Sequence, residues 1–430
     1  MKVSSHGMVA SITANLVDLM VVCGDIVSSS PLKYLLYVGL IYLKHLLLIS
    51  IDRLRVFAGA VFLSSRPDSL MGTALGDCKM TYIGEEPVSG GYSSSVRRVY
   101  LDNGDVENPD SVIVKTSSSA LRVRIFASGG YQREVNFYNQ ISHTLPIPIP
   151  KIYHSKWDKW RCSEIIIMEN IAMGSSVVDK VRTSENPEAV AEEAVLFAAR
   201  MHARYWGATP STLANSSLGR YTWLKGYDCI QGKNEGMYKF SIFFISYLWG
   251  RLKAAMPEER GDITWNGIKW SRELVEFIDT LIDGSTWDAC QAFWRTREHP
   301  LTLVHGDYHV GNQIWDEKTD KLYTIDWSEV AVGEGPADVA QSFLDFRQVS
   351  NDSNWENELI GTYWMELAEQ GVDHLSYPLS MCREAYVRGG IDRGIQVLIG
   401  MVDKVTAFVA AHEAEYQRPY IISTPYLCQW

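Results

Sequence analysis

A change in residue pattern along the chain is the feature that most constrains its fold. Short runs of β-branched and aromatic residues occupy 96–101, 112–114 and 164–168. Apolar residues recur at helical spacing over 131–141, 188–206, 235–256, 271–283 and much of 340–416. We expect strands in the first group and helices in the second. This order predicts an α+β fold with two lobes, a small β-rich lobe followed by a larger, mostly helical lobe.

The length of 430 residues is sufficient for two lobes and an extension. We expect residues 1–75 to form an N-terminal apolar and helical extension, 76–170 the small lobe and 171–430 the large lobe. Residues 34–51 are strongly apolar, but Lys44 interrupts them, and a spanning helix needs about 20 apolar residues. Two alternatives therefore stay open for residues 31–63: membrane association through a spanning or interfacial helix, and helices packed on the protein itself.

The overall charge and the cysteines narrow the classes of partner and compartment. The formal net charge is −11, and no long run of Lys and Arg is present, so we expect no nucleic-acid partner. The seven Cys are scattered and form no CxxC pair, which indicates reduced thiols and a cytoplasmic location, with membrane association left open by the apolar segment. The sequence gives no indication of the oligomeric state.

The segment 301–330 carries the residues with the clearest chemistry. Two strand-like runs, 301–304 and 322–325, surround a polar loop that contains Asp307 and Asn312, and Asp326 follows the second run. Phosphoryl transfer from ATP needs a carboxylate to orient and deprotonate the acceptor hydroxyl, and oxygen ligands that hold Mg²⁺ on the phosphates. We predict that Asp307 is the catalytic base and that Asn312 and Asp326 are the Mg²⁺ ligands. The spacing is that of a kinase catalytic loop.

At these residues the chain resembles the aminoglycoside phosphotransferase and choline kinase superfamily, in particular its CHK-kinase-like (ecdysteroid-kinase-like) branch. In that group the catalytic loop reads HGD-x-x-x-x-N and the metal motif reads ID-[WF], as residues 305–312 and 325–327 do here. The resemblance covers residues 80–350 by motif. It implies a protein-kinase-like fold, ATP and Mg²⁺ as cofactors, and a small-molecule hydroxyl acceptor.

The resemblance implies roles for further residues. Lys115 matches the strand lysine that contacts the α- and β-phosphates, and Glu134 matches its partner on a helix. Glu169 and Asn170 match the hinge between the lobes, where adenine would bind. Asp338 matches an aspartate that stabilises the catalytic loop.

The expected phosphate loop, residues 88–96, departs from the family pattern because it is rich in serine and is not G-x-G-x-x-G. Its backbone amides can still bind phosphate oxygens, and we assign Ser93 and Ser94 to this contact.

Other residues near the loop receive structural interpretations. We expect His305 to order the loop through hydrogen bonds rather than to transfer protons, and His309 to be structural, with a substrate contact as the alternative. Trp315 and Trp327 are expected in the core. The GD-x-H sequence also occurs in binuclear metallophosphatases, but the further Asp/His clusters of that class are absent from the sequence. No A-P-E segment follows Asp326, which disfavours a protein kinase.

Two functional hypotheses follow. The first is an Mg²⁺- and ATP-dependent kinase of a small-molecule hydroxyl, whose acceptor pocket is built by the aromatic residues of 238–249, with core packing as the alternative role of those aromatics. That density favours a hydrophobic or aromatic alcohol. The second is a catalytically weak pseudokinase that binds a nucleotide or a partner and docks through residues 1–75. The complete set of Asp307, Asn312 and Asp326 favours the enzyme.

Overall fold

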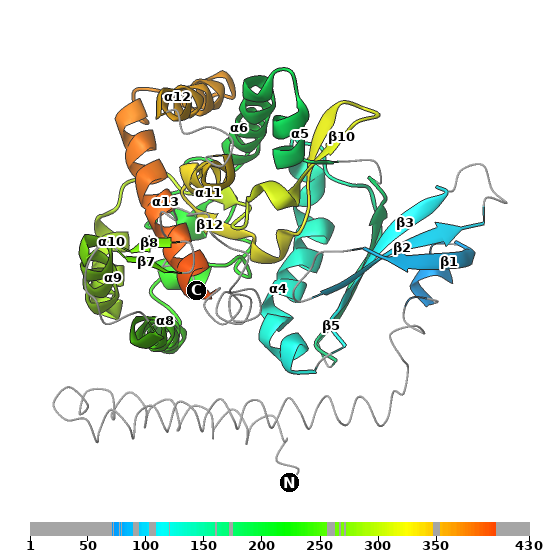
Figure 1. Ribbon diagram of the computed structural model, residues 1–430, viewed down its shortest axis with the longest axis horizontal. Coiled ribbons are helices and arrows are strands. Elements are labelled where there is room, and N and C mark those ends of the chain that lie inside the picture. Colours follow the sequence, from blue (N-terminus) through cyan, green and yellow to red (C-terminus); the bar gives the residue numbers. More distant parts are fainter. Residues whose placement is uncertain are drawn as a thin grey trace, which may run out of the picture.

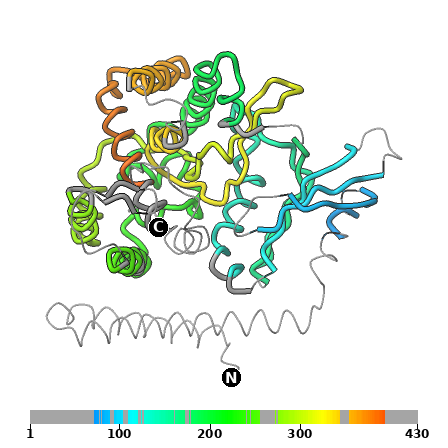
Figure 2. Tube along the Cα trace, viewed as in Figure 1, coloured from blue at the N-terminus to red at the C-terminus, as the bar shows by residue number. Residues whose placement is uncertain are grey.

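The computed structural model describes residues 71–88, 94–102, 109–171, 175–255, 263–270, 272–346 and 353–400, with short breaks at 72, 77, 79, 120, 160 and 266–267. These residues form two lobes: a sheet with one long helix beside it, and a larger part that is mostly helical (Figure 1). Figure 2 traces the chain from the small lobe, in blue and cyan, to the large lobe, in green to orange.

The small lobe contains a five-stranded antiparallel sheet with the strand order β1-β2-β3-β5-β4. Its elements are β1 (Tyr82–Pro87), β2 (Ser94–Leu101), β3 (Ser111–Ser117), α4 (Leu121–Gln140), η2 (Ser142–Thr144), β4 (Ile152–Asp158) and β5 (Ser163–Glu169).

The two faces of this sheet pack on different cores because successive side chains of a strand point to opposite sides. Val112 and Val114 of β3 are buried with Leu75, which precedes the sheet in the chain. Lys115 lies on the opposite face, where Ile166 of β5 is its neighbour in the sheet. Ile166 belongs to the core that continues into α4 and the large lobe. The alternation in β3 therefore directs Lys115 toward α4.

The large lobe contains helices and short strand pairs. Short strands surround the loop that contains Asp307. β9, which precedes this loop, pairs with β12, and β10, which follows it, pairs with β11 and β6. The elements are β6 (Ser175–Ser176), α5 (Val177–Thr183), α6 (Pro187–Ala203), η3 (Leu213–Asn215), α7 (Tyr227–Ile230), α8 (Glu235–Ala255), β7 (Ile263–Trp265), β8 (Ile268–Trp270), α9 (Arg272–Gly284), α10 (Trp287–Thr296), β9 (Thr302–Val304), η4 (Val310–Asn312), β10 (Gln313–Asp316), β11 (Lys321–Thr324), η5 (Trp327–Glu329), β12 (Ala331–Gly333), α11 (Pro336–Phe346), α12 (Ser353–Glu369) and α13 (Leu379–Gly400).

The predicted α+β fold class, with a small β-rich lobe and a larger helical lobe, is confirmed. The domain boundaries at 75 and 170 stay predictions. The helix expected over 131–141 begins earlier, at Leu121, because Gly129 and Gly130 do not break it. The strands β1 and β4 and the helix α10 were not expected from the sequence pattern. Trp315 and Trp327 are buried, as predicted.

The expected N-terminal extension lies almost entirely outside the described residues, and so does the apolar segment 31–63. Within the part of the chain that the structure describes, no helix combines the length and the apolar character needed to cross a membrane.

Candidate active site

Lys115 lies at the point where the two lobes meet. Its ammonium Nζ is 2.7 Å from Glu134 Oε2 on α4 and 3.0 Å from Asp326 Oδ1, just after β11. Lys115 and Glu134 are buried. The structure thus brings together a strand, a helix and a loop residue that are far apart in the sequence, as the sequence analysis expected of Lys115 and Glu134.

The charges of this cluster are strongly coupled. Burial by itself would lower the pKa of Lys115, but the carboxylates of Asp326, Glu134 and Glu164 outweigh this effect and raise it well above its usual value. Desolvation disfavours the charged form of Asp326, yet the adjacent Lys115 ammonium, together with hydrogen bonds, lowers the pKa of Asp326 to about 2. Lys115 is therefore a cation and Asp326 an anion near neutral pH.

Glu164 is a member of this cluster that the sequence analysis missed. It is buried on β5, and its Oε1 accepts a hydrogen bond of 3.4 Å from Ser94 Oγ. Burial, and then the nearby Glu134 charge, raise the pKa of Glu164 well above its usual value. The sequence contains a signal for it, because Glu164 directly precedes the apolar run 165–168 of a buried strand.

Backbone geometry shapes the loop that carries Asp307. Gly306 has φ +76°, and a Cβ at this position would lie 2.2 Å from the carbonyl oxygen of Glu329, so the position requires glycine. Asp338 accepts hydrogen bonds from the backbone amides of His305 (2.6 Å) and Gly306 (3.0 Å). These contacts fit the expected loop-stabilising role of Asp338.

His305 is held inside this loop. Its Nδ1 accepts a hydrogen bond from the Asp307 amide (3.3 Å), and its Nε2 lies 3.0 Å from the carbonyl oxygen of Ile325. Burial lowers the pKa of His305 to about 4, so the ring is neutral near pH 7. Both observations agree with the expectation that His305 orders the loop by hydrogen bonds.

The carboxylate of Asp307 is about one quarter exposed and is contacted from several elements. Asn312 Nδ2 donates to the Asp307 carbonyl oxygen (2.9 Å) and lies 3.3 Å from Oδ2, while His309 Nε2 is 3.6 Å from Oδ2. Gln341 Nε2 on α11 donates to Oδ1 (3.0 Å), and Arg393 on α13 forms an ion pair with the same oxygen. Sequence reasoning missed Gln341 and Arg393, because neither belongs to a local motif.

The predicted metal ligands lie on the same hairpin. The Asn312 carbonyl oxygen accepts a hydrogen bond of 3.0 Å from the Ile325 amide, which places Asp326 next to Asn312. Asp326 also adopts a left-handed backbone conformation, with φ +61°, which is uncommon for a residue other than glycine. Among the described residues, no group of three or more His, Cys, Asp or Glu side chains could hold a metal ion. A set with one carboxylate and one amide oxygen suits Mg²⁺ only with phosphate or water oxygens as further ligands.

The remaining predicted residues are placed as follows. Glu169 Oε2 accepts a hydrogen bond of 3.1 Å from the Lys151 amide, and Asn170 Nδ2 donates one of 2.8 Å to Ser111 Oγ. Both lie where the chain leaves β5. Ser94 begins β2, whereas Ser93 lies outside the described residues.

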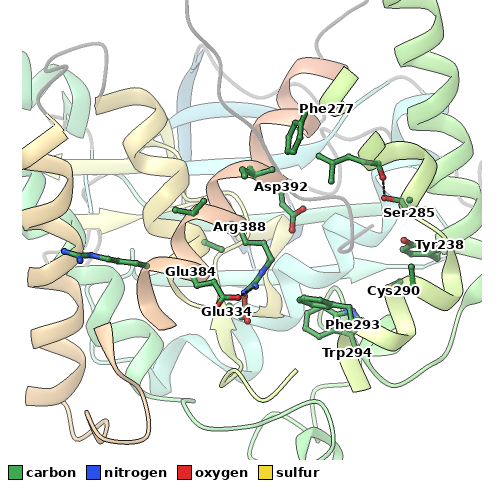
Figure 3. Close-up of a pocket in the computed structure, with 18 of the residues that line it drawn as sticks. Tyr238, Phe277, Ser285, Cys290, Phe293, Trp294, Glu334, Glu384, Arg388 and Asp392 are labelled. Atoms are coloured by element: carbon green, nitrogen blue, oxygen red, sulfur yellow. Dashed lines mark hydrogen bonds and ion pairs between the residues drawn. The ribbon is translucent and has the colours of Figure 1, made fainter. Parts of the chain in front are cut away.

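A cavity of about 780 Å³ lies in the large lobe, among α8, α9, α10, α11 and α13. Its walls are mostly apolar and aromatic, and Figure 3 shows Arg388 extending toward Glu334 beside Phe293 and Trp294. No residue of the loop 305–312 lines the cavity, but two helices that line it, α11 and α13, also contact Asp307. Ala337, which lines the cavity, precedes Gln341 by one helical turn on α11, and Gln341 contacts Asp307.

The cavity differs from the expectation that the aromatic residues of 238–249 would build it, because Tyr238 is the only described residue of this segment in its lining. Tyr238 lines it, but Trp249 is buried elsewhere against Asp279, and Tyr247 is 53% exposed. The side chains of Phe240 and Phe244 lie outside the described set. The aromatic wall comes instead from Phe277 on α9 and from Phe293 and Trp294 on α10. The reason is helical periodicity, because consecutive residues of α8 face different neighbours.

The comparison with solved structures finds distant similarity. The chain is similar to a choline kinase from Cryptosporidium parvum Iowa II (12% identity, 78% of this chain and 89% of that chain covered, TM-score 0.47). It is also similar to the Plasmodium vivax ethanolamine kinase (12% identity, 78% of each chain, TM-score 0.42) and to a GDP complex of an aminoglycoside 2′-phosphotransferase variant (10% identity, 80% and 99%, TM-score 0.39). No curated protein matches the chain at a significant level.

The comparison with protein families also finds a match. The sequence profile of the phosphotransferase enzyme family, APH, matches residues 86–363, which include the Lys115 cluster and the loop of Asp307. This range is well over half of the chain. The chain therefore belongs to the phosphotransferase enzyme family.

Proposed function

We propose that this phosphotransferase is an ATP-dependent kinase that phosphorylates a hydroxyl group of a small molecule. The observation that carries the proposal is the convergence of Glu134 Oε2 and Asp326 Oδ1 on Lys115 Nζ, at 2.7 Å and 3.0 Å, beside the hairpin that carries Asp307 and Asn312. A fixed cation beside an ionised carboxylate, at one point between two lobes, is among the parts that transfer from ATP requires. The proposal also places the chain in the CHK-kinase-like branch of the superfamily.

In this proposal Asp307 orients the acceptor hydroxyl and takes its proton. The acceptor oxygen forms a bond to the γ-phosphorus while the bond between that phosphorus and the ADP oxygen breaks. Lys115 contacts the α- and β-phosphates, and Glu134 holds Lys115 in place. Glu169 and Asn170 contribute backbone groups to adenine binding, while Ser93 and Ser94 contribute to phosphate binding.

Asn312 and Asp326 would hold Mg²⁺, which neutralises the charge on the phosphates. The donor set fits this ion, because Asp326 is ionised, with its pKa lowered to about 2. The Asn312 side chain is buried and held by Asp307 on the same loop.

The cavity between α8–α11 and α13 is the acceptor site in this proposal. Its volume of about 780 Å³ suits a drug-sized molecule. Glu334, at its floor, is already paired with Arg297, His299 and Arg388, so this carboxylate is not available to a cationic acceptor. A neutral, hydrophobic or aromatic alcohol fits these walls.

The test is a screen of hydroxylated metabolites with the purified protein, read by ADP release and by the mass of the product. Asp307→Asn should retain its affinity for Mg·ATP and lose turnover about 10²–10⁴-fold, because a general base contributes about that much. Asp316→Asn, on the same hairpin but on its exposed turn, serves as the control. Unchanged turnover in Asp307→Asn would remove Asp307 from the mechanism, and metal-independent nucleotide binding without turnover would favour the pseudokinase.

A further inference from the structure

One face of helix α4 is attached to the segment that follows Asp326. Gly130, Arg133 and Phe137 are spaced at three and four residues, so they lie along one side of the helix. Phe137 stacks on Trp327 with the ring centroids 3.8 Å apart and the planes at 10°. The Arg133 guanidinium crosses to the large lobe, where Nε donates to the Ser328 carbonyl oxygen at 2.8 Å.

An ion network closes this contact. Arg133 Nη2 lies 3.0 Å from Glu329 Oε1, and Lys225 Nζ forms an ion pair with the other oxygen of the same carboxylate. Lys225 is itself fixed by backbone hydrogen bonds to Val330 (3.2 Å) and Val332 (3.0 Å). Arg133 and Lys225 together outweigh the effect of burial and lower the pKa of Glu329. The network therefore joins α4 to a rigid part of the large lobe.

Gly130 lies against the same segment. A Cβ at this position would be in van der Waals contact with Ser328, at 3.4 Å from its Cβ. The backbone of α4 therefore approaches Ser328 closely beside the contact of Arg133.

We propose that Arg133, Glu329 and Lys225 form an interlobe lock that holds α4 in place before any ligand binds. Glu134 follows Arg133 on α4, and Asp326 lies three residues before Glu329, so the lock fixes the two carboxylates that hold Lys115. Arg133 and Glu329 are thus positioning residues for the phosphate-binding lysine. The inference rests on the proposed nucleotide site for its functional meaning.

The test compares Mg·ATP with adenosine, which lacks phosphates. In Arg133→Met the Kd for Mg·ATP should rise about tenfold or more, because Lys115 and Asp326 lose their relative placement. The Kd for adenosine should change less than about threefold, since adenosine does not reach those residues. Arg133→Lys should recover part of the loss, because it keeps the charge but not both contacts.

Two further variants complete the design. The double variant Arg133→Met, Glu329→Gln should have a Kd for Mg·ATP no higher than that of the single variant that binds more weakly. Both changes break the same network, so their effects should not add. Arg200→Met is the matched control, since Arg200 joins α6 to Glu366 on α12, away from the site, and it should leave both Kd values unchanged. Equal losses for Mg·ATP and adenosine, or no loss for either, would overturn the proposal.

A second readout does not depend on nucleotide binding. Hydrogen exchange of residues 131–140 should accelerate about tenfold or more in ligand-free Arg133→Met and stay unchanged in Arg200→Met. Unchanged exchange would refute the lock. If native protein binds no Mg·ATP, the proposed function fails, while the exchange result still decides the lock. If Arg133→Met does not fold, Arg133→Lys and Glu329→Gln are compared in its place.

Discussion

Two clusters of charged side chains, one around the buried Lys115 and one around the buried Glu334, differ in how completely their groups are paired. The lysine cluster, between the lobes, contains three carboxylates and one cation: Lys115, Glu134, Glu164 and Asp326. The glutamate cluster, at the floor of the cavity, contains two carboxylates, two guanidinium groups and an imidazole: Glu334, Glu384, Arg297, Arg388 and His299.

Individual oxygens show the same contrast. Both oxygens of Glu334 have partners, since Oε1 is 3.0 Å from Arg297 Nε and Oε2 is paired with Arg388. Glu164 Oε2 is buried and has no hydrogen-bond donor among the described residues. A buried polar group without a partner destabilises the fold. We therefore expect more carboxylates than protein cations at a site where a bound cation supplies the missing partner. Under the proposed function the lysine cluster would serve binding, whereas the pairs of Glu334 join α13 to the segment that follows α10.

The largest effect that this contrast predicts is for Asp326→Ala. Mg²⁺-dependent nucleotide binding should be lost and turnover should fall about 10³-fold, because several kcal/mol of charge stabilisation is removed. The free energy of unfolding should also fall, by about 1–2 kcal/mol, because the lowered pKa of Asp326 means that its charge stabilises the fold, in part screened by solvent. Calorimetric titration with Mg·ATP and chemical unfolding measure the two quantities. Normal Mg²⁺ dependence in this variant would assign the ligand elsewhere.

The glutamate cluster should respond in the opposite way. Glu334→Ala removes the buried carboxylate that Arg297 and Arg388 share and leaves them only the exposed Glu384, which should destabilise the fold by about 3 kcal/mol. The affinity for Mg·ATP should stay the same. Urea unfolding checks the first expectation, and Glu317→Ala is the control, because its exposed pair with Lys180 is worth less than about 1 kcal/mol. A stable Glu334→Ala protein with weak nucleotide binding would reverse the two roles.

Acid should affect the glutamate cluster in a defined range. Burial disfavours the charge of Glu334, but His299 and the two arginines outweigh it and lower its pKa to about 2. The unfolded value is near 4.5, so this carboxylate contributes stability above about pH 4.5 that is lost as the pH falls toward 2. That contribution is about 3 kcal/mol. Unfolding curves of native protein and Glu334→Gln should therefore converge over this range, and parallel curves would contradict the assignment.

The smallest effect is expected for Glu164→Gln. Burial, and then the nearby Glu134 charge, raise the pKa of Glu164 well above its usual value, which favours the neutral carboxyl, and an amide reproduces the shape and polarity of that form. The affinity for Mg·ATP should change by less than about threefold, and the free energy of unfolding by less than about 1 kcal/mol. A large loss of affinity would show that Glu164 is ionised when nucleotide is bound.

The local features of the site could be predicted from the sequence. Asp307 and Asn312 are five residues apart on one loop, and a short hairpin, β10–β11, returns the chain to Asp326. Alternation in β3 sends Lys115 to the face that packs on α4. These relations depend on spacing within a few residues, which sequence patterns record directly.

The contacts between distant elements were decided only by the tertiary structure. Gln341 and Arg393 reach Asp307 from α11 and α13, and Arg133 reaches Glu329 from α4. The aromatic residues that line the cavity come mainly from α9 and α10 rather than from the aromatic stretch of α8. Each of these contacts depends on how separately formed helices pack, and the pattern within one helix shows which side is apolar but not which neighbour covers it. The sequence thus determined the loop of Asp307 and its hairpin, while packing determined what surrounds them.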